Sequence, residues 1–100
     1  LVVVPASEIR LAEFVDGVVW LQTDRGRFRA AARNLLELEA RLDAGSFVRI
    51  SRQVLVNRER VREVTSSRRR GVWIVLDGAD ALLPVSRRRV PELRRALGVR

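Results

Sequence analysis

The alternation of apolar and polar residues predicts short strands in the first thirty positions of the chain. The dipeptide Asp16-Gly17 is typical of a two-residue hairpin turn, because glycine readily adopts the positive φ that such turns need. The β-branched and aromatic segment 18–23 follows it, and a second turn signal over 24–26 precedes an alternating segment over 27–30. Short strands joined by glycine-containing turns predict an antiparallel meander. The run Leu1 to Val4, which stops at a proline, predicts an edge or linking strand.

The apolar period lengthens between residues 32 and 42, where Leu35, Leu38 and Leu42 are spaced at i, i+3 and i+7. This spacing places the leucines on one stripe of a short helix, with charged residues between them. The segment 43–45 is predicted to end the helix, with Gly45 as its left-handed cap. One helix therefore follows the meander.

A polar trio, Ser51-Arg52-Gln53, interrupts the apolar pattern of the segment 47–64, FVRISRQVLVNRERVREV. Apolar residues predict a strand before the trio and a second strand over 54–56. An arginine held between two buried segments presents its charge from a fixed base, as nucleic-acid contact requires. Taken alone, the trio is more typical of a solvated turn, so the interpretation of Arg52 depends on the rest of the chain.

The last third of the chain predicts a hairpin followed by a helix. The segment 72–76 is apolar on both faces and predicts a buried central strand, and Asp77-Gly78 begins a turn through 79–80 into a strand over 81–85. Ser86 is predicted to cap the final helix, and Gly98 to end it. Its apolar stripe consists of Val90, Leu93 and Leu97. We therefore predict one mainly β domain over 1–100, with antiparallel strands and two short helices.

The composition excludes several classes of function. The chain has 100 residues and contains no cysteine and no histidine, which excludes disulfides, thiolate chemistry and histidine-dependent catalysis or metal binding. Its carboxylates are scattered over turns and helix faces, and its glycines lie singly, so we expect neither an enzyme nor a bound cofactor. No apolar run approaches membrane-spanning length, and we expect a cytoplasmic protein.

The net charge of +8 is unevenly distributed. Residues 1–50 contain seven arginines and seven acidic residues, whereas residues 51–100 contain thirteen arginines and five acidic residues. All of the cations are arginines, whose planar guanidinium can bind a phosphate or a guanine edge through two hydrogen bonds. A basic field on one half of a domain is typical of a polyanion partner.

Three basic sites follow from this distribution: Arg52, the run 68–70 and the run 87–89. The last is the most specific, because it follows a predicted strand and opens a predicted helix, whose N-terminus favours an anion. For the run 68–70, a solvated loop and a phosphate contact are equally consistent with the sequence. The aromatic residues lie in strand patterns, where we expect core packing; they are Phe14, Trp20, Phe28, Phe47 and Trp73.

Two blocks of this sequence resemble the LytTR DNA-binding domain of bacterial transcription regulators. The family pattern is an F-x-R-I-H-R-S-x-x-V-N block, then a strand hairpin, then a P-V-S-R-R block that opens the C-terminal helix. The first block corresponds to Phe47, Arg49, Ile50, Ser51, Arg52, Gln53, Val56 and Asn57. The second block corresponds to Pro84, Val85, Ser86, Arg87 and Arg88. The early hairpin and the leucine-rich helix also match, so the resemblance covers nearly the whole chain.

The resemblance implies an elongated, mostly β fold in which loops, rather than a recognition helix, enter the DNA grooves. In the family, a residue of the first hairpin loop and an arginine before the last helix reach bases in successive major grooves. Matching positions imply that Arg88 reads bases, with Arg87 adjacent, and that Arg52 faces the DNA between the two grooves. Arg89 and Arg69 are phosphate candidates on charge alone.

Three positions depart from the family pattern. Ser51 replaces the family's histidine and Gln53 replaces its serine, so the hydrogen bonding around Arg52 is expected to differ. Gly17 falls at the hairpin-loop position and has no side chain with which to read a base. Ser51, Asn57 and Gly17 remain interface candidates by their place in the pattern.

We therefore expect the output domain of a bacterial transcription regulator, of the response-regulator type, that binds specific sequences in double-stranded DNA. Because the chain starts at leucine, we expect a fragment whose N-terminal receiver or sensory domain is missing. The resemblance also implies direct repeats in the DNA and a homodimer on them. Two alternatives stay open: a single-stranded nucleic-acid binder, which needs exposed aromatic residues on the basic face, and a domain that binds an acidic protein.

Overall fold

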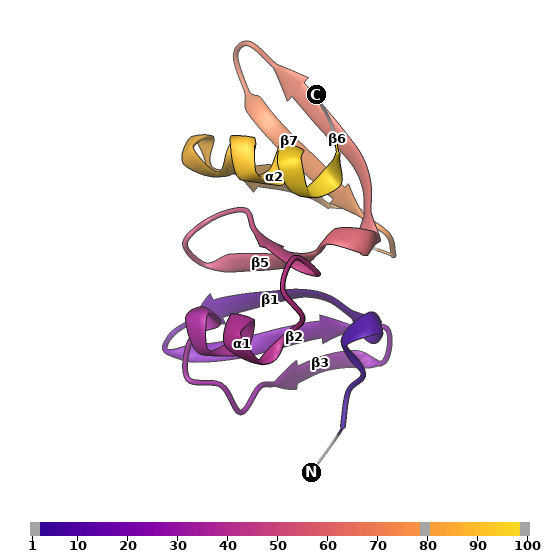
Figure 1. Cartoon of the computed structure of the whole chain (residues 1–100), viewed down its shortest axis with the longest axis vertical. Coiled ribbons are helices and arrows are strands. Elements are labelled where there is room, and N and C mark those ends of the chain that lie inside the picture. The colour runs from indigo at the N-terminus through magenta and orange to yellow at the C-terminus, as the bar shows by residue number, and fades with distance from the viewer. Residues whose placement is uncertain (1–2, 79–80, 99–100) are drawn as a thin grey trace.

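The computed structural model describes residues 3–78 and 81–98, and the molecule is elongated, with extents of 44 × 25 × 23 Å (Figure 1). A five-stranded first sheet has the order β3–β2–β1–β5–β4, and a three-stranded second sheet has the order β6–β7–β8. The strands are β1 (Ile9–Val15), β2 (Val18–Thr23), β3 (Gly26–Arg29), β4 (Phe47–Arg49), β5 (Val54–Asn57), β6 (Val61–Ser67), β7 (Gly71–Leu76) and β8 (Leu82–Val85). The helices are α1 (Leu35–Arg41) and α2 (Val90–Leu97), with 3-10 turns η1 (Ala6–Glu8), η2 (Arg58–Arg60) and η3 (Arg87–Arg89). The predicted mainly β, antiparallel fold with two helices is confirmed.

The predicted meander forms one side of the first sheet. β1 pairs with β2 and β2 pairs with β3, all antiparallel, and Val15 lies opposite Val18 across the two-residue turn. Both turn residues have positive φ, 50° at Asp16 and 79° at Gly17. This backbone matches the right-handed twist of paired strands, which explains why the Asp-Gly dipeptide predicted the hairpin correctly.

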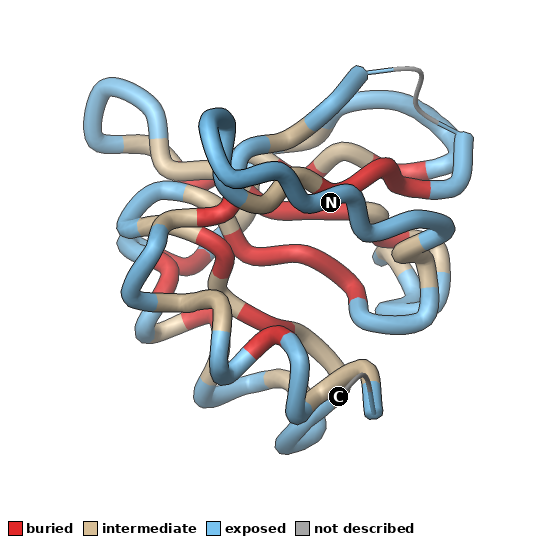
Figure 2. The backbone as a smooth tube through the Cα atoms, turned by 90° about the horizontal axis from the view of Figure 1, so that it is seen from above, coloured by how far each residue is buried: buried red, intermediate tan, exposed pale blue. Residues whose placement is uncertain are grey.

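The interior consists of two hydrophobic clusters, one on each face of the first sheet. On one face, Leu35 and Leu38 of α1 pack with Leu55 of β5. On the other face, the central strands pack with the second sheet and α2, where Ile74 and Leu93 are both fully buried. Figure 2 shows these buried segments inside the molecule, with the turns exposed around them. Because α2 is packed through Leu93, the residues just before it have a fixed position.

α2 follows its predicted sequence signals. Pro91 lies in the first turn, where its missing N–H costs no hydrogen bond. Gly98 ends the helix in the left-handed conformation, with φ 70°. Val90 and Leu97 pack against the same cluster as Leu93, so the predicted apolar stripe is confirmed.

Three local predictions are wrong. Val3 and Val4 belong to no strand; Leu1 and Val2, like the loop positions 79–80, lie outside the described residues. Gly45 does not cap α1: the helix ends earlier, at Arg41, with Leu42 as its C-cap, and Gly45 has its positive φ in the following turn. The side chain of Ser86 makes no capping hydrogen bond, because the helix begins only after an intervening 3-10 turn.

Within residues 3–78 and 81–98, no helix combines the length and apolar character needed to cross a membrane.

Candidate nucleic-acid interface

Three exposed segments lie along one long edge of the molecule, at the left of Figure 1. They are the β1–β2 turn at Gly17, the loop 51–53 between β4 and β5, and η3 at the start of α2. The segments are far apart in the sequence, and the strands that precede or follow them bring them to the same edge. This edge therefore carries most of the residues that the sequence singled out.

The loop 51–53 is held on both sides by hydrogen bonds. The backbone N–H of Phe14 in β1 donates to the carbonyl of Gln53 at 2.8 Å. The guanidinium of Arg49 donates to the carbonyl of Arg52 at 3.1 Å, and the N–H of Gln53 donates to the hydroxyl of Ser51 at 3.3 Å. The exposed side chain of Arg52 therefore extends from a fixed backbone, as its place between two strands predicted.

A backbone hydrogen bond joins η3 to the end of β4. The N–H of Ser86 donates to the carbonyl of Ile50 at 2.7 Å, and Ile50 is 1% exposed. This bond fixes the start of the run 87–89 beside the loop that carries Arg52. The two sequence blocks that resemble the family thus meet in space through a backbone contact.

The arginines of η3 have different surroundings. Arg89 pairs with Glu92 at 3.4 Å, one helical turn further on. Arg87 and Arg88 are exposed and form no ion pair with any residue in the described part of the chain. Their charges are therefore available to an external anion.

A groove of about 1320 Å³ separates η3 and the loop 51–53 from the start of α1. We call it the basic groove; its lining residues are Phe14, Asn34, Leu35, Leu36, Arg49, Ser51, Arg52, Gln53, Ser86, Arg88, Arg89 and Glu92. It brings together four of the predicted interface residues: Ser51, Arg52, Arg88 and Arg89. Arg87, Arg69, Asn57 and Gly17 do not line it.

Arg49 is a residue of the basic groove whose role the sequence did not reveal. Its side chain is 16% exposed, and besides its bond to the loop it pairs with Glu39 of α1 at 3.6 Å. It therefore links α1 to the loop that carries Arg52. The family pattern contains this arginine, but its spacing alone does not distinguish a positioning residue from a DNA contact.

Asn57 has a structural position, which argues against its predicted place in the interface. It is 6% exposed, and its side-chain amide donates to the carbonyl of Ile9 at 2.9 Å. Its side-chain oxygen accepts from the N–H of Glu59 at 3.1 Å. Buried polar groups need such partners, so Asn57 joins β5 to the start of β1 and shapes η2.

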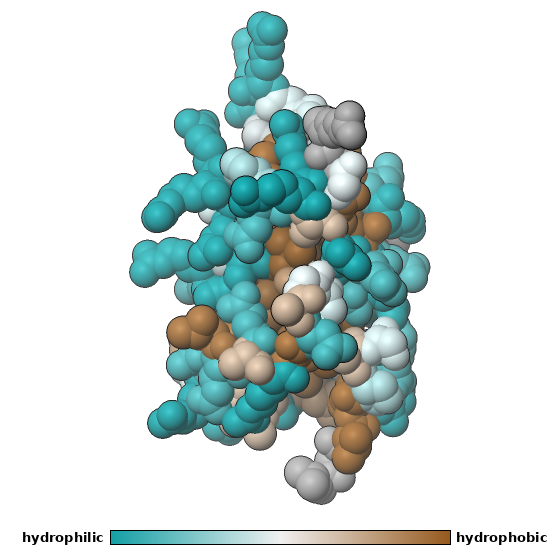
Figure 3. Space-filling view, viewed as in Figure 1, coloured by the Kyte–Doolittle hydropathy of each residue, from teal (hydrophilic) through white to brown (hydrophobic). Residues whose placement is uncertain are grey.

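Gly17 and Arg69 lie outside the groove at separate tips. Gly17 is exposed at the β1–β2 turn, and a Cβ added there would meet no atom within 4 Å, although its φ of +79° disfavours other side chains. Arg69 is exposed in the β6–β7 turn with Arg68 and Arg70. Figure 3 shows long hydrophilic side chains that project from the left edge and from the upper tip of the molecule.

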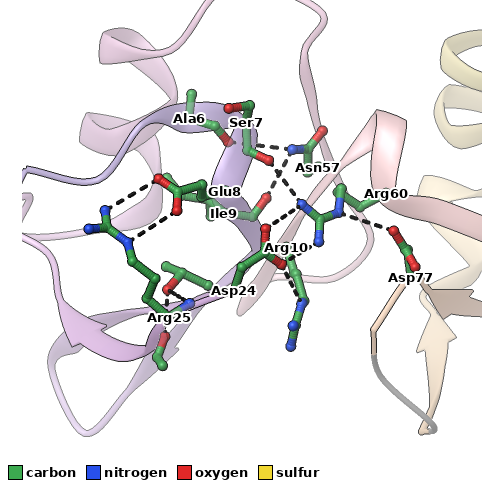
Figure 4. A network of polar contacts seen from close by, with 12 residues as sticks. Ala6, Ser7, Glu8, Ile9, Arg10, Asp24, Arg25, Asn57, Arg60 and Asp77 are labelled. Atoms are coloured by element: carbon green, nitrogen blue, oxygen red, sulfur yellow. Dashed lines mark hydrogen bonds and ion pairs between the residues drawn. The ribbon is translucent and has the colours of Figure 1, made fainter.

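The side of the molecule shown in Figure 4 carries a network of ion pairs instead. Arg60 of η2 donates to Asp24 at 3.1 Å and to the carbonyl of Ser7 at 3.0 Å, and its Nε lies 3.7 Å from a carboxylate oxygen of Asp77. Arg10 donates to Asp24 at 3.2 Å. The network thus joins the β2–β3 turn of the first sheet to the end of β7 in the second sheet.

The hydrogen bond from Arg60 lowers the pKa of Asp24 below its ordinary value of 3.8, with a smaller contribution from Arg10. The same pair raises the pKa of Arg60. Both groups are therefore charged near neutral pH, and the network neutralises its own charge rather than offering it to a ligand.

Comparison with known proteins agrees with the two sequence blocks. The sequence matches the LytTR family, described as the LytTr DNA-binding domain, over residues 1–98. It is 33% identical over 106 residues to the CO-responsive transcriptional regulator RcoM of Rhodospirillum rubrum, covering 96% of this chain and 45% of that protein. A LytTr DNA-binding domain from Bacillus cereus has a similar structure, with a TM-score of 0.83 and 23% identity over 95% of this chain and 85% of that chain.

The chain belongs to the LytTR family of DNA-binding domains. The solved structure adds the likeness of fold, and RcoM is a transcriptional regulator with a region similar to this chain. The chain spans less than half of the length of RcoM. The predicted family and fold are both confirmed, and the family is one of DNA-binding domains rather than of enzymes.

Proposed function

We propose that the chain binds specific sequences in double-stranded DNA, as the output domain of a bacterial transcription regulator. The observation that carries the proposal is the backbone bond from Ser86 to Ile50, which places Arg88 and Arg52 on one groove of a LytTR domain. Neither arginine has an ion-pair partner among the described residues.

The shape of the domain suits a duplex that runs along its exposed edge. The long extent of 44 Å exceeds one turn of B-DNA, which is about 34 Å. A domain of this length can therefore contact two successive major grooves from one side. The β1–β2 turn and η3 lie towards opposite ends of that edge, with the loop 51–53 between them (Figure 1).

In this proposal Arg88 reads a base and Arg52 contacts the DNA between the major grooves. A guanidinium that donates two hydrogen bonds to one guanine contributes about 1–3 kcal/mol of discrimination against other bases. Arg88 is suited to this role because η3 is anchored at Ser86 and α2 is anchored through Leu93. Arg87 is adjacent, and Ser51 can donate or accept a hydrogen bond beside Arg52.

The remaining exposed arginines supply affinity through phosphate contacts. Arg69 in the β6–β7 turn is a phosphate contact in this scheme, and Arg89 has a smaller role because Glu92 already pairs with it. Each neutralised phosphate releases condensed counterions, so affinity should fall steeply as salt rises. Gly17 has no side chain. At the β1–β2 turn, only the backbone and Val18 are therefore left to contact the other major groove.

The wider context of the domain is part of the same proposal. We infer that two copies bind a direct repeat, and that a receiver or sensory domain in the same protein controls this binding. RcoM, in which a matching domain accounts for 45% of the length, supports the presence of such a further domain. The function proposed places the protein in the cytoplasm, where the DNA is.

The test of Arg88 begins with a selection from random-sequence duplex DNA by the domain. Fluorescence anisotropy then compares the selected duplex with a scrambled one for the wild type, Arg88→Ala and Arg29→Ala. Arg29, which is exposed on β3 at the outer edge of the first sheet, away from α2 (Figure 1), is the matched control for the loss of one charge. We expect Arg88→Ala to lower affinity for the selected duplex about 10- to 100-fold, with a much smaller loss on the scrambled duplex.

Equal losses on both duplexes would refute the reading role of Arg88 and leave it as a phosphate contact. An affinity of Arg29→Ala that fell as far as that of Arg88→Ala would show that net charge, rather than position, determines binding.

A further inference from the structure

The second sheet has one face that packs against the core and one that lines a separate cavity. Ile74 and Leu76 of β7 point to the face that α2 covers, where both are fully buried. Trp73 alternates with them and lies opposite Thr65 of β6 and Pro84 of β8. Because successive strand residues point to opposite faces, Trp73 lies on the face away from α2.

The cavity on this outer face has a volume of about 570 Å³, and strands of the second sheet and their hairpin turn supply its lining. Its lining residues are Thr65, Ser67, Arg68, Arg69, Arg70, Gly71, Trp73 and Leu82. None of them lines the basic groove, so the two sites are separate. The expectation that Trp73 packs in the core is therefore wrong, because it borders this cavity.

Hydrogen bonds fix the ring of Trp73 to the turn. Its indole N–H donates to the carbonyl of Arg70 at 2.8 Å, and the N–H of Arg70 donates to the hydroxyl of Ser67 at 2.9 Å. The only donor of the indole is thus used, and what the ring presents to the cavity is its apolar surface. Leu82 adds a further apolar surface and is 54% exposed.

The rim of the cavity is strongly positive. Arg68, Arg69 and Arg70 are all exposed, and none forms an ion pair with another described residue. An occupant must therefore offer negative charge beside a flat or apolar group. Both features occur together in a nucleotide, whose base can stack on an aromatic ring while arginines bind its phosphates.

We propose that this cavity binds a single-stranded segment of nucleic acid, with one unpaired base against Trp73 and the adjacent phosphates at Arg68–Arg70. A paired duplex cannot fill it, because its bases are stacked on one another and are not free to stack on a side chain. An acidic peptide fits less well: arginine forks match phosphate oxygens, and the fixed indole offers stacking rather than a hydrogen bond. The site is separate from the basic groove, and Arg69, which is the proposed duplex phosphate contact at this tip, is shared by the two kinds of nucleic acid.

The experiment uses the Trp20→Phe variant of the chain, in which Trp73 is the only tryptophan. Its emission is recorded during titration with a thymidine oligonucleotide, a uridine oligonucleotide of equal length, a duplex and a glutamate-rich peptide with one phenylalanine. We expect both oligonucleotides to quench the emission of Trp73. The oligonucleotide that binds more tightly then shows whether the ligand of the cavity is DNA or RNA. The peptide should leave the emission almost unchanged, and the duplex should quench it much less than either oligonucleotide, because it can contact Arg69 but has no unpaired base to stack on Trp73.

Affinities of two further variants separate stacking from packing. Trp73→Leu retains apolar bulk, and we expect it to lower affinity for the oligonucleotide about tenfold while duplex affinity stays within about twofold. Trp73→Phe retains an aromatic face and should restore most of the affinity. These duplex titrations also test the basic groove independently, so failure of one site is not mistaken for failure of the other.

Three results would overturn the proposal. The first is an unchanged oligonucleotide affinity in Trp73→Leu. The second is an equal loss for oligonucleotide and duplex, which would make Trp73 a general structural residue. The third is quenching by the glutamate-rich peptide at least as strong as by the oligonucleotides, which would assign the cavity to a protein partner.

Discussion

The arginines of the first fifty residues and those of the second fifty have different electrostatic surroundings. In the first half, six of the seven arginines lie within ion-pair distance of a carboxylate: Arg10, Arg25, Arg27, Arg33, Arg41 and Arg49. In the described part of the second half, those with such a partner are Arg60, Arg62 and Arg89. Described arginines without one include Arg52, Arg68, Arg69, Arg70, Arg87 and Arg88.

This difference separates arginines whose charge is already paired within the fold from arginines whose charge is available to a ligand. Arg27 of β3 illustrates the first kind, since it lies 4.2 Å from the centre of the Trp20 ring and also pairs with Glu13. Arg88 illustrates the second, because it lines the basic groove with no partner among the described residues. A net charge alone would count both arginines equally, although only the unpaired one has a charge that no described carboxylate neutralises.

The largest expected effect concerns Arg60, a second-half arginine with several partners elsewhere in the fold. Arg60→Gln removes its bonds to Asp24, Ser7 and Asp77, which join the two sheets. Its side chain is only 17% exposed, so we expect the free energy of unfolding to fall by roughly 2 kcal/mol, as for hydrogen bonds to charged groups. Urea denaturation measures this change.

The matched control is Arg62→Gln, which removes an exposed ion pair with Glu63 at 3.8 Å. Such pairs contribute little, so its unfolding free energy should stay within about 0.5 kcal/mol of wild type. If the two variants were equally stable, the inter-sheet network would have no structural role. DNA affinity of Arg60→Gln, measured where the variant is folded, should stay close to wild type.

The same network predicts a dependence of stability on pH. Because Arg60 lowers the pKa of Asp24 below its ordinary 3.8, the folded state binds fewer protons than the unfolded state between the two values. The stabilisation is therefore fully present above pH 3.8 and is lost as the pH falls through the lowered pKa. Melting curves between pH 7 and pH 2 should show a steeper decline for wild type than for Asp24→Asn; parallel declines would contradict this assignment.

The smallest effect concerns one charge at the tip of the second sheet. Arg69→Ala should weaken binding to all duplexes alike and reduce the slope of log affinity against log salt by about 1, because one phosphate contact is lost. Arg33→Ala is the control, since Arg33 is also exposed but pairs with Glu37 at 3.2 Å. Identical slopes for the two variants would show that ion pairing does not distinguish arginines that bind DNA.

Sequence patterns predicted the elements that depend on local chemistry. The Asp-Gly turn, the two helices and the three strands of the meander each follow from residues adjacent in the chain, and all are present. Gly45 and Ser86 were assigned wrongly because several nearby residues can end or begin a helix. Which one does so depends on packing that no local pattern records.

The site could be predicted only in part. Arg52, Arg88 and Arg89 were found from charge and from the family blocks, and the fold brings them to one groove. The bond from Ser86 to Ile50 that joins those blocks is a backbone contact, which side-chain identity cannot reveal. Asn57 is the opposite case. It belongs to the family pattern, but its burial and its hydrogen bond to Ile9 indicate that it supports the fold.

The central claim is that the unpaired arginines of the second half, and not the paired arginines of the inter-sheet network, contact duplex DNA. An NMR titration of the arginine Nε–H signals with the selected duplex tests it most directly. We expect the signals of Arg52, Arg87 and Arg88 to shift or broaden, while those of Arg10 and Arg60 stay in place. Shifts at Arg10 and Arg60 with unchanged signals at Arg52 and Arg88 would contradict the account and move the interface to the opposite side of the domain.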